Sequence, residues 1–254
     1  AMGEDLYHPT LMPHSHLREL AFKGDGQGLR DYGADVVKRD PTRGFAQESL
    51  ELSALVCEEK YVEANAYLES LVYRYRGEIG EETVRDATLL NGAFIDFALG
   101  RFDQLQSRAD QIFSLDRDGS LIEPYNKLII HRLLAENAFL HDQMDSVQDI
   151  YLAASKIRLV EEKTHSHYTL NLMKCMTEFV RGDFKEAYSL AEQNIVLARI
   201  HGYKGVASDI AANHLQARAL VAMAKEVEAE KLLQEVSDRA FAASLWPWYF
   251  VTQN

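Results

Sequence analysis

The sequence GDFKEA at residues 182–187 decides the fold, because it is a short polar turn placed between two amphipathic stretches. The same arrangement returns at 24–29, 59–64, 100–105, 142–147 and 224–229. The last residues of the five clearest copies are spaced by 41, 42, 40 and 42 residues, while the copy at 24–29 is fainter. Self-similarity at a fixed period of about 20 to 50 residues is the signature of a repeat architecture. These turns therefore predict a series of helical hairpins.

Two positions within the predicted hairpins recur in register with the turns. Twelve residues before the end of each turn stand Leu52, Ala93, Ala135, Cys175 and Ala217, of which four are small. Eight residues before the end stand the bulky residues Val56, Phe97, Phe139, Phe179 and Val221. Small side chains let two helices approach closely, and a bulky stripe at helical spacing is usually core. We therefore expect the phenylalanines, together with Phe94, to pack between helices rather than to line a groove.

Proline and glycine positions agree with a helical chain. Pro41 and Pro124 fall just before the first helices of hairpins, where proline is tolerated, and Gly202 falls where a helix end is expected. No extended alternating run predicts a strand. The expected fold is all-α: a right-handed superhelical solenoid of about six hairpins over residues 14–243, with a period of about 41 residues. Residues 1–13 are expected to be the remnant of a cleaved tag and a flexible lead-in.

The turn at 182–187 and the small Cys175 ahead of it resemble the tetratricopeptide repeat, in which a small residue precedes a Gly-Asp-aromatic and Glu-Ala pattern. The period exceeds the usual length of about 34 residues, which indicates longer helices. This longer unit is similar to the helical-repeat domain of bacterial regulators related to the maltose-operon activator and other large LuxR-type regulators. Residues 198–202, 215–220 and 228–233 carry that similarity, which covers roughly 15–243.

The resemblance implies a sensing role. In those regulators the repeat domain lies between a nucleotide-binding domain and a DNA-binding helix-turn-helix, and it receives an inducer or a partner. Neither neighbour is recognised in this sequence, and the glycine-rich stretch at 24–30 lacks the lysine and hydroxyl of a phosphate-binding loop. The resemblance therefore implies the ligand- or protein-sensing segment of a transcriptional regulator. The alternatives are a stand-alone adaptor that binds a peptide or helix of a partner protein, and a peptide-pheromone receptor.

Composition argues against several classes of function. Lys and Arg total 27 against 39 Asp and Glu, a net charge of −12 over 254 residues, so direct binding to nucleic acid is not expected. No apolar run approaches the roughly 18 residues of a membrane span. Cys57 and Cys175 are far apart and lie within apolar patterns, which is typical of reduced thiols in a cytoplasmic protein.

No constellation of residues predicts catalysis, a metal or a cofactor. The sequence has no Gly-x-Ser-x-Gly or His-Glu-x-x-His motif, and the charges of Glu58 and Glu59 beside Cys57 favour a raised pKa for its thiol. His8, His14 and other histidines lack the spacing of a structural zinc site. We therefore expect a binding module without enzyme activity.

Polar side chains recur on the expected concave face, which is the usual binding surface of a solenoid. Three of them stand sixteen residues before the turn ends and three stand close by: His131, Asn171 and Asn213, with Arg132, His214 and Arg218. Such side chains suit a peptide backbone or a polyhydroxylated small molecule. We predict a protein, peptide or small-molecule ligand there, and the alternative is that these positions are merely solvated.

The C-terminal segment 244–254 is unusual because it holds both tryptophans. Its aromatic residues are Trp246, Trp248, Tyr249 and Phe250. Pro247 is expected to end the last helix. One interpretation of the segment is a hydrophobic cap over the final hairpin, which terminal repeats require. The other is an interface with a further domain or with a second copy in a homodimer.

Overall fold

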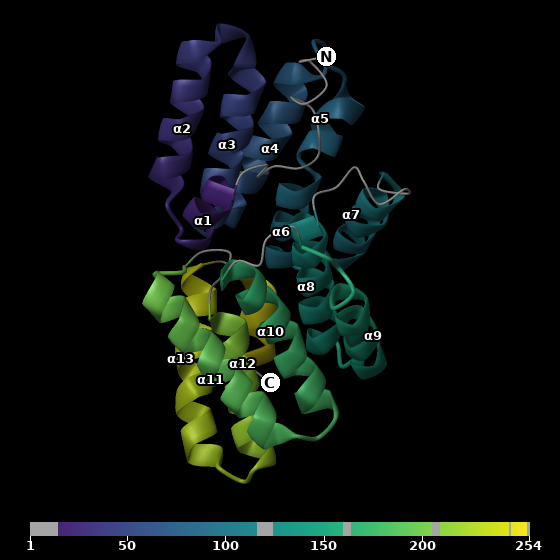
Figure 1. Ribbon diagram of the computed structural model, residues 1–254, viewed down its shortest axis with the longest axis vertical. Helices are drawn as coiled ribbons and strands as arrows, with labels where there is room; N and C mark the ends of the chain where they lie inside the picture. Colours follow the sequence, from purple (N-terminus) through teal and green to yellow (C-terminus); the bar gives the residue numbers. More distant parts are fainter. Residues whose placement is uncertain (1–14, 116–123, 160–163, 205–208, 244, 253–254) are drawn as a thin grey trace.

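The computed structural model describes residues 15–115, 124–159, 164–204, 209–243 and 245–252 (Figure 1). Within these residues the chain is helical and has no strand, which confirms the all-α prediction. The α-helices are α1 (Ser15–Phe22), α2 (Gly26–Arg39), α3 (Gly44–Cys57), α4 (Tyr61–Tyr75), α5 (Glu81–Ala87), α6 (Leu89–Ala98), α7 (Phe102–Leu115), α8 (Pro124–Leu140), α9 (Met144–Ala154), α10 (Thr164–Val180), α11 (Phe184–His201), α12 (Ile210–Ala222), α13 (Glu226–Ala242) and α14 (Trp246–Thr252). A short 3-10 helix, η2 (Pro41–Arg43), precedes α3.

Each of the six predicted turns joins two consecutive helices that pack on one another: α1–α2, α3–α4, α6–α7, α8–α9, α10–α11 and α12–α13. One residue in every turn adopts a positive φ: Gly24, Glu59, Gly100, Asp142, Gly182 and Ala224. The next residue donates its backbone N–H five residues back, as in Asp183 N to Glu178 O at 3.0 Å and Lys225 N to Leu220 O at 2.9 Å. This is the Schellman arrangement, which satisfies carbonyls at a helix end. The six turns therefore share one backbone geometry.

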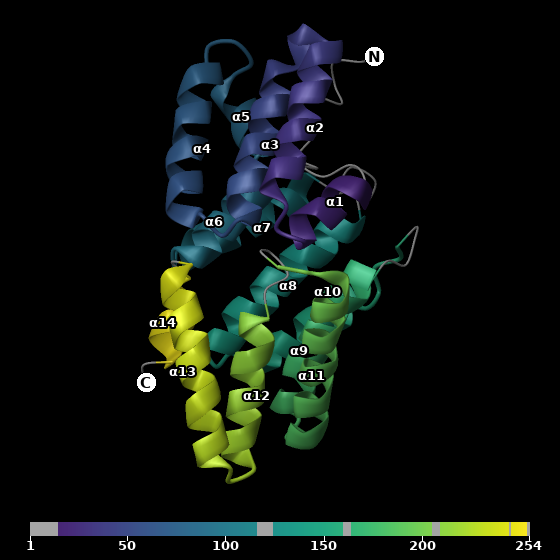
Figure 2. The same ribbon diagram turned by 90° about the vertical axis from the view of Figure 1, so that its left-hand side faces the viewer.

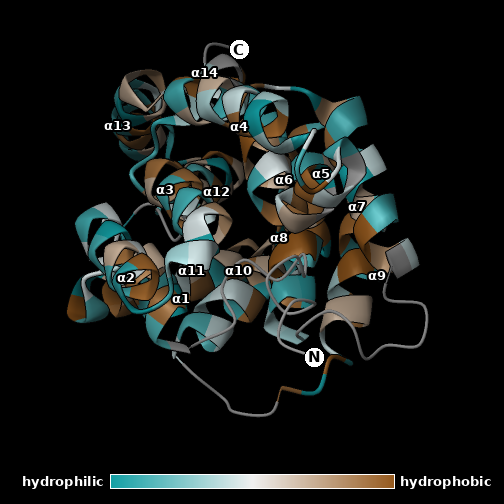
Figure 3. Ribbon diagram, turned by 90° about the horizontal axis from the view of Figure 1, so that it is seen from above, coloured by the Kyte–Doolittle hydropathy of each residue, from teal (hydrophilic) through white to brown (hydrophobic). Residues whose placement is uncertain are grey.

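The core lies where the first helices of successive pairs meet. α6 contacts α3 and α8, and α10 contacts α8 and α12. Every residue of α6 is buried, and Figure 3 shows hydrophobic residues along α6 and α8 in the middle of the molecule. The five positions expected to allow close approach are all fully buried: Leu52, Ala93, Ala135, Cys175 and Ala217. Phe94, Phe97 and Phe139 are buried as well, so the prediction that they are core is confirmed.

Contacts between distant parts of the chain close the molecule in a way that the repeat pattern does not predict. The ring of Phe22 in α1 lies 5.3 Å from that of His165 and 5.3 Å from that of Tyr203, centroid to centroid. The Lys204 N–H donates to the Phe22 carbonyl at 2.5 Å. At the other end, α14 contacts α6 and α8 in addition to α13, and Figure 2 shows it next to α6. Neighbour-only stacking would leave these interior faces open.

Prolines and one extra helix mark the departures from the predicted pattern. Pro124 is the first residue of α8, and Pro41 begins the 3-10 helix before α3. The expectation that Pro247 ends the last helix is wrong, because α13 already ends at Ala242 and Pro247 lies in the first turn of α14. Proline is tolerated there because first-turn N–H groups have no partner within the helix. α5, between the second and third pairs, was not predicted from the turns.

Hydropathy and helix length together exclude a membrane span within the described helices, since none is both long and apolar enough to cross a bilayer.

Candidate partner-binding surface

Two of the predicted binding residues, Arg132 and His214, lie in the interior with 5% and 2% of their surfaces exposed. Arg132 Nε donates to Glu136 Oε2 at 3.3 Å, and both side chains of this ion pair are buried. The His214 ring lies 5.0 Å from the ring of Trp248. Burial lowers the pKa of His214 to about 3, and the Arg218 cation adds to the effect, so this imidazole is neutral.

The other four predicted residues are half-buried on three helices. His131 Nδ1 lies 2.7 Å from the Lys127 carbonyl, and Asn171 donates to the Asn194 side chain at 3.2 Å. The Arg218 guanidinium lies over the rings of Phe139 and Phe179, 4.6 and 5.0 Å from their centroids, and donates to Asp142 Oδ1 at 3.3 Å. Asn213 lies on α12.

The predicted residues thus contribute mostly to packing between helices. The cause is the closure of the molecule by α1 and α14, which covers the interior. Ligand binding by these residues stays a prediction, and a ligand that contacts Arg132 or His214 has to enter the interior.

Helix α14 forms part of the C-terminal aromatic segment. Trp248 is buried against His214, and Tyr249 is half-buried and packs against the core. Trp248 therefore packs against the last helix pair, and the choice between a cap and an interface stays a prediction. The side chains of Trp246 and Phe250 lie outside the described part of the structure, so the interface prediction stays open for them.

Thiol and metal chemistry find no support in the described residues. Burial raises the pKa of Cys57 and of Cys175 to about 12, so both are thiols at neutral pH. No three or more His, Cys, Asp or Glu side chains gather as a metal would need within the described ranges, and His8 and His14 lie outside them.

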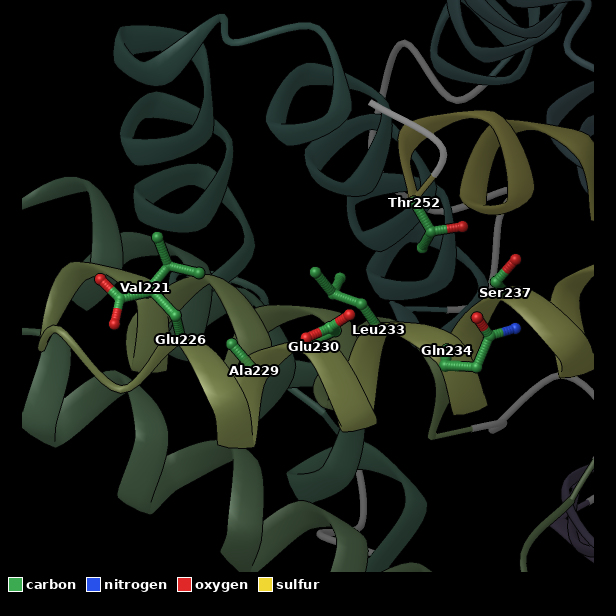
Figure 4. A pocket seen from close by; sticks show the side chains of 8 residues that line it. All are labelled: Val221, Glu226, Ala229, Glu230, Leu233, Gln234, Ser237 and Thr252. Atoms are coloured by element: carbon green, nitrogen blue, oxygen red, sulfur yellow. The ribbon is translucent and has the colours of Figure 1, made fainter.

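A hollow of about 300 Å³ runs along α13, from the end of α12 to the end of α14 (Figure 4). Its lining consists of Val221 from α12, Thr252 from α14, and Glu226, Ala229, Glu230, Leu233, Gln234 and Ser237 from α13. The α13 residues recur at intervals of three and four, so they form one continuous face of that helix. The hollow is therefore an elongated surface along a helix rather than a compact cavity.

Comparison with the preceding pair shows why this face is uncovered. The positions on α11 that lie 42 residues before Glu226, Glu230 and Leu233 are Phe184, Tyr188 and Ala191. α12 packs against α11, and Ala191 is fully buried. On α13 the corresponding Leu233 is half-buried, and the two glutamates are exposed. The aromatic residues of α11 are thus replaced by carboxylates on α13.

The charge in the hollow comes from two carboxylates. Glu226 and Glu230 stand four residues apart on one face of α13, and within the described structure neither forms an ion pair with a basic side chain. The chain as a whole carries a net charge of −12. Unpaired carboxylates beside Val221 and Leu233 favour a ligand that is both apolar and positively charged.

The sequence of the turns contains a signal for this surface. Two residues after each positive-φ position, four of the earlier turns carry a large apolar or aromatic residue: Tyr61, Phe102, Met144 and Phe184. At the same position the last turn carries Glu226. The last pair therefore lacks the large side chain that four of the five earlier pairs carry at this position.

Comparison with known proteins provides no relative for this chain: no protein-family model, no curated protein and no solved structure matches it significantly.

Proposed function

We propose that this chain is a non-catalytic protein-binding module built as a tetratricopeptide-like, right-handed solenoid with a repeat of about 41 residues. The shared geometry of the six turns supports the repeat, because equivalent positive-φ residues recur at 59, 100, 142, 182 and 224. The contacts that link α3, α6, α8, α10 and α12 in succession support a solenoid, in which each repeat packs on its neighbours.

One observation favours protein binding at the end of this stack. The bulky position is buried in three of the four earlier pairs, with Val56 at 1%, Phe97 at 4% and Phe139 at 0% exposure, and half-buried in the fourth at Phe179, whereas Val221 in the last pair is 50% exposed. The hollow on α13 begins beside it. An apolar position that is more exposed in the last pair than in every earlier pair marks a surface suited to a partner.

Site-specific photo-crosslinking tests this function. A photoreactive amino acid at position 221 is expected to trap a discrete partner protein in extracts of cells that make the protein. The matched control places the same group at position 152, because Leu152 on α9 is equally exposed at 49% and lies outside the hollow. A band that forms equally from both positions, or from neither, would contradict protein binding at this surface.

A second candidate is the predicted sensing segment of a bacterial transcriptional regulator, with a small polar ligand in the interior. The observation that favours it is a pair of buried atoms, Arg132 Nη1 and His214 Nδ1, that have no hydrogen-bond partner among the described residues. Buried polar groups usually bind protein, water or ligand.

A thermal-shift screen with sugars, nucleotides and amino acids tests this second function. A ligand at a hundredfold excess over its Kd stabilises the native state by about 2.7 kcal/mol. A hit that persists in a His214→Gln variant would not support an interior site at His214.

A further inference from the structure

We propose that the hollow binds a single amphipathic α-helix of a partner protein, with aliphatic residues on one face and Lys or Arg beside them. The helix would lie antiparallel to α13 and in line with α14. This inference rests on the proposed protein-binding function and specifies the chemistry of the partner.

The shape of the hollow indicates a helix. Its lining on α13 extends from Glu226 to Ser237, eleven residue steps, or about 16 Å at a rise of 1.5 Å per residue. This length corresponds to about three helical turns. Along the hollow, one continuous helix face supplies the wall, which is how grooves that receive amphipathic helices are built.

The position of α14 indicates how a partner helix would be oriented. α14 packs against α13 and has 7 residues, whereas α8 and α10 have 17 each. Its final residue, Thr252, lines one end of the hollow, and Val221 lines the other (Figure 4). The hollow therefore occupies the space beside α13 beyond α14. A partner helix there would cover α13 much as α12 covers α11.

The molecule contains its own example of such a contact. Phe139, the bulky residue of the α8–α9 pair, is covered by Phe179 with ring centroids 5.5 Å apart, and by the Arg218 guanidinium. Arg218 also donates to Asp142. Two following helices thus cover the bulky position: α10 supplies an apolar residue and α12 supplies an arginine that reaches a carboxylate. Val221 is the corresponding position without such a cover.

The carboxylates of Glu226 and Glu230 select a basic helix. They occupy the positions of Phe184 and Tyr188 on the covered helix α11, and they lie beside apolar side chains. A terminal cap that faces only water would be expected to be polar throughout. The exposed Val221 and the half-buried Leu233 do not fit that description. A helix with an apolar face and flanking Lys or Arg would match both the apolar side chains and the carboxylates. Charges at the rim of an interface mainly set specificity and association rate.

A matched pair of peptides tests the proposal on the full chain. Both are fluorescein-labelled, helix-stabilised 14-residue peptides with the same Leu/Ala face, and they differ in carrying Lys or Glu on the flanks. Fluorescence anisotropy at low salt is expected to show that the Lys peptide binds at least about tenfold more tightly, because opposite charges meet at the rim. Raising the salt concentration should reduce this difference.

Reversing the charges of the two glutamates tests whether the peptide binds at the hollow. The double variant Glu226→Lys, Glu230→Lys is expected to lose the preference for the Lys peptide and to bind the Glu peptide better. The control Glu63→Lys, Glu69→Lys changes the net charge equally on exposed positions of α4 and should keep the original preference. Circular dichroism melting curves confirm that both variants are folded.

Four results would overturn the inference. Equal binding of the two peptides would show that the hollow does not select a basic helix. An unchanged preference in the Glu226→Lys, Glu230→Lys variant would show the same. Failure of both peptides while crosslinking at position 221 still traps a protein would reject the helix but leave the proposed function intact. A dimer of the chain alone in analytical ultracentrifugation, abolished by Val221→Asp, would identify a second copy as the occupant instead.

Discussion

The pairs α10–α11 and α12–α13 have the same turn geometry but opposite surroundings. Gly182 and Ala224 both adopt a positive φ, and the hydrogen bonds that close the two turns correspond. The outer face of α11 is covered by α12, whereas the equivalent face of α13 borders a hollow. One backbone unit therefore gives either a buried interface or an uncovered surface. The presence of a following helix, and the residues at a few positions, decide which of the two results.

The largest difference between covered and uncovered positions is expected at the bulky residue. Phe139→Ala should reduce the free energy of unfolding by about 3 to 5 kcal/mol, because it leaves a cavity under Phe179 and Arg218. Val221→Ala should change it by less than about 0.5 kcal/mol, because Val221 is half exposed. Urea unfolding followed by circular dichroism measures both. Similar costs would mean that Val221 is covered in solution.

A glutamate introduced on the two helix faces provides the second comparison. Ala191→Glu is expected to cost about 3 kcal/mol, because the site on α11 is fully buried and the new side chain is both too large and charged. Leu233→Glu at the equivalent position of α13 should cost less than about 1 kcal/mol. Thermal unfolding of the two variants distinguishes these values. A Leu233→Glu cost equal to that of Ala191→Glu would contradict the uncovered face.

The third comparison concerns how stability depends on pH through Glu59. This residue lies in the α3–α4 turn, and the charges of Asp209 and Arg239 from the last pair act on its carboxyl. Burial raises the pKa of Glu59 to about 7, the Arg239 cation opposes this shift, and Asp209 adds to it. Because the folded state holds this proton more tightly, the stabilisation is complete below the unfolded pKa near 4.5 and is lost as pH rises through about 7.

Glu59→Gln should therefore remove a decrease in the free energy of unfolding of about 1 to 2 kcal/mol between pH 5 and 8, a value reduced for solvent screening of this half-buried group. Urea denaturation across that pH range provides the measurement. Identical pH profiles for the variant and the native chain would show that the Glu59 carboxyl is not buried in the folded state.

The smallest effect is expected at the two turns themselves. Ala224→Gly should stabilise the chain by about 0.5 to 1 kcal/mol, because glycine adopts a positive φ without the steric cost that a Cβ adds. Gly182→Ala should destabilise it by a similar amount. Differential scanning calorimetry of both variants provides the test. Shifts of the same sign would show that the two turns are not equivalent.

Local features of the fold could be predicted from the sequence because they depend on neighbouring residues. The turn at 182–187 and its copies predicted where helix pairs join, and the small residues predicted which positions are buried. These features follow from helix capping and from the size of one side chain at a crossing point. The extra helix α5 falls between two recognised pairs and left no comparable pattern.

Long-range closure explains why the candidate site was predicted less well. Arg132 and His214 occupy positions that would face an open concave surface if each pair touched only its neighbours. Contacts of Phe22 with His165, and of Trp248 with His214, bury this interior instead. Pairings between residues so far apart in the chain cannot be read from periodicity. The uncovered face of α13 could be predicted in part, because Glu226 replaces the large apolar or aromatic residue found in four of the earlier turns.

Amide hydrogen exchange of the full chain, with and without the Lys-flanked peptide, is the most direct test of the central claim. Slower exchange is expected in 221–237 and 246–252 on peptide binding, with unchanged exchange in α8 and α10. Slower exchange around Arg132 and His214 instead, with α13 unaffected, would contradict this claim and would move the binding site into the interior.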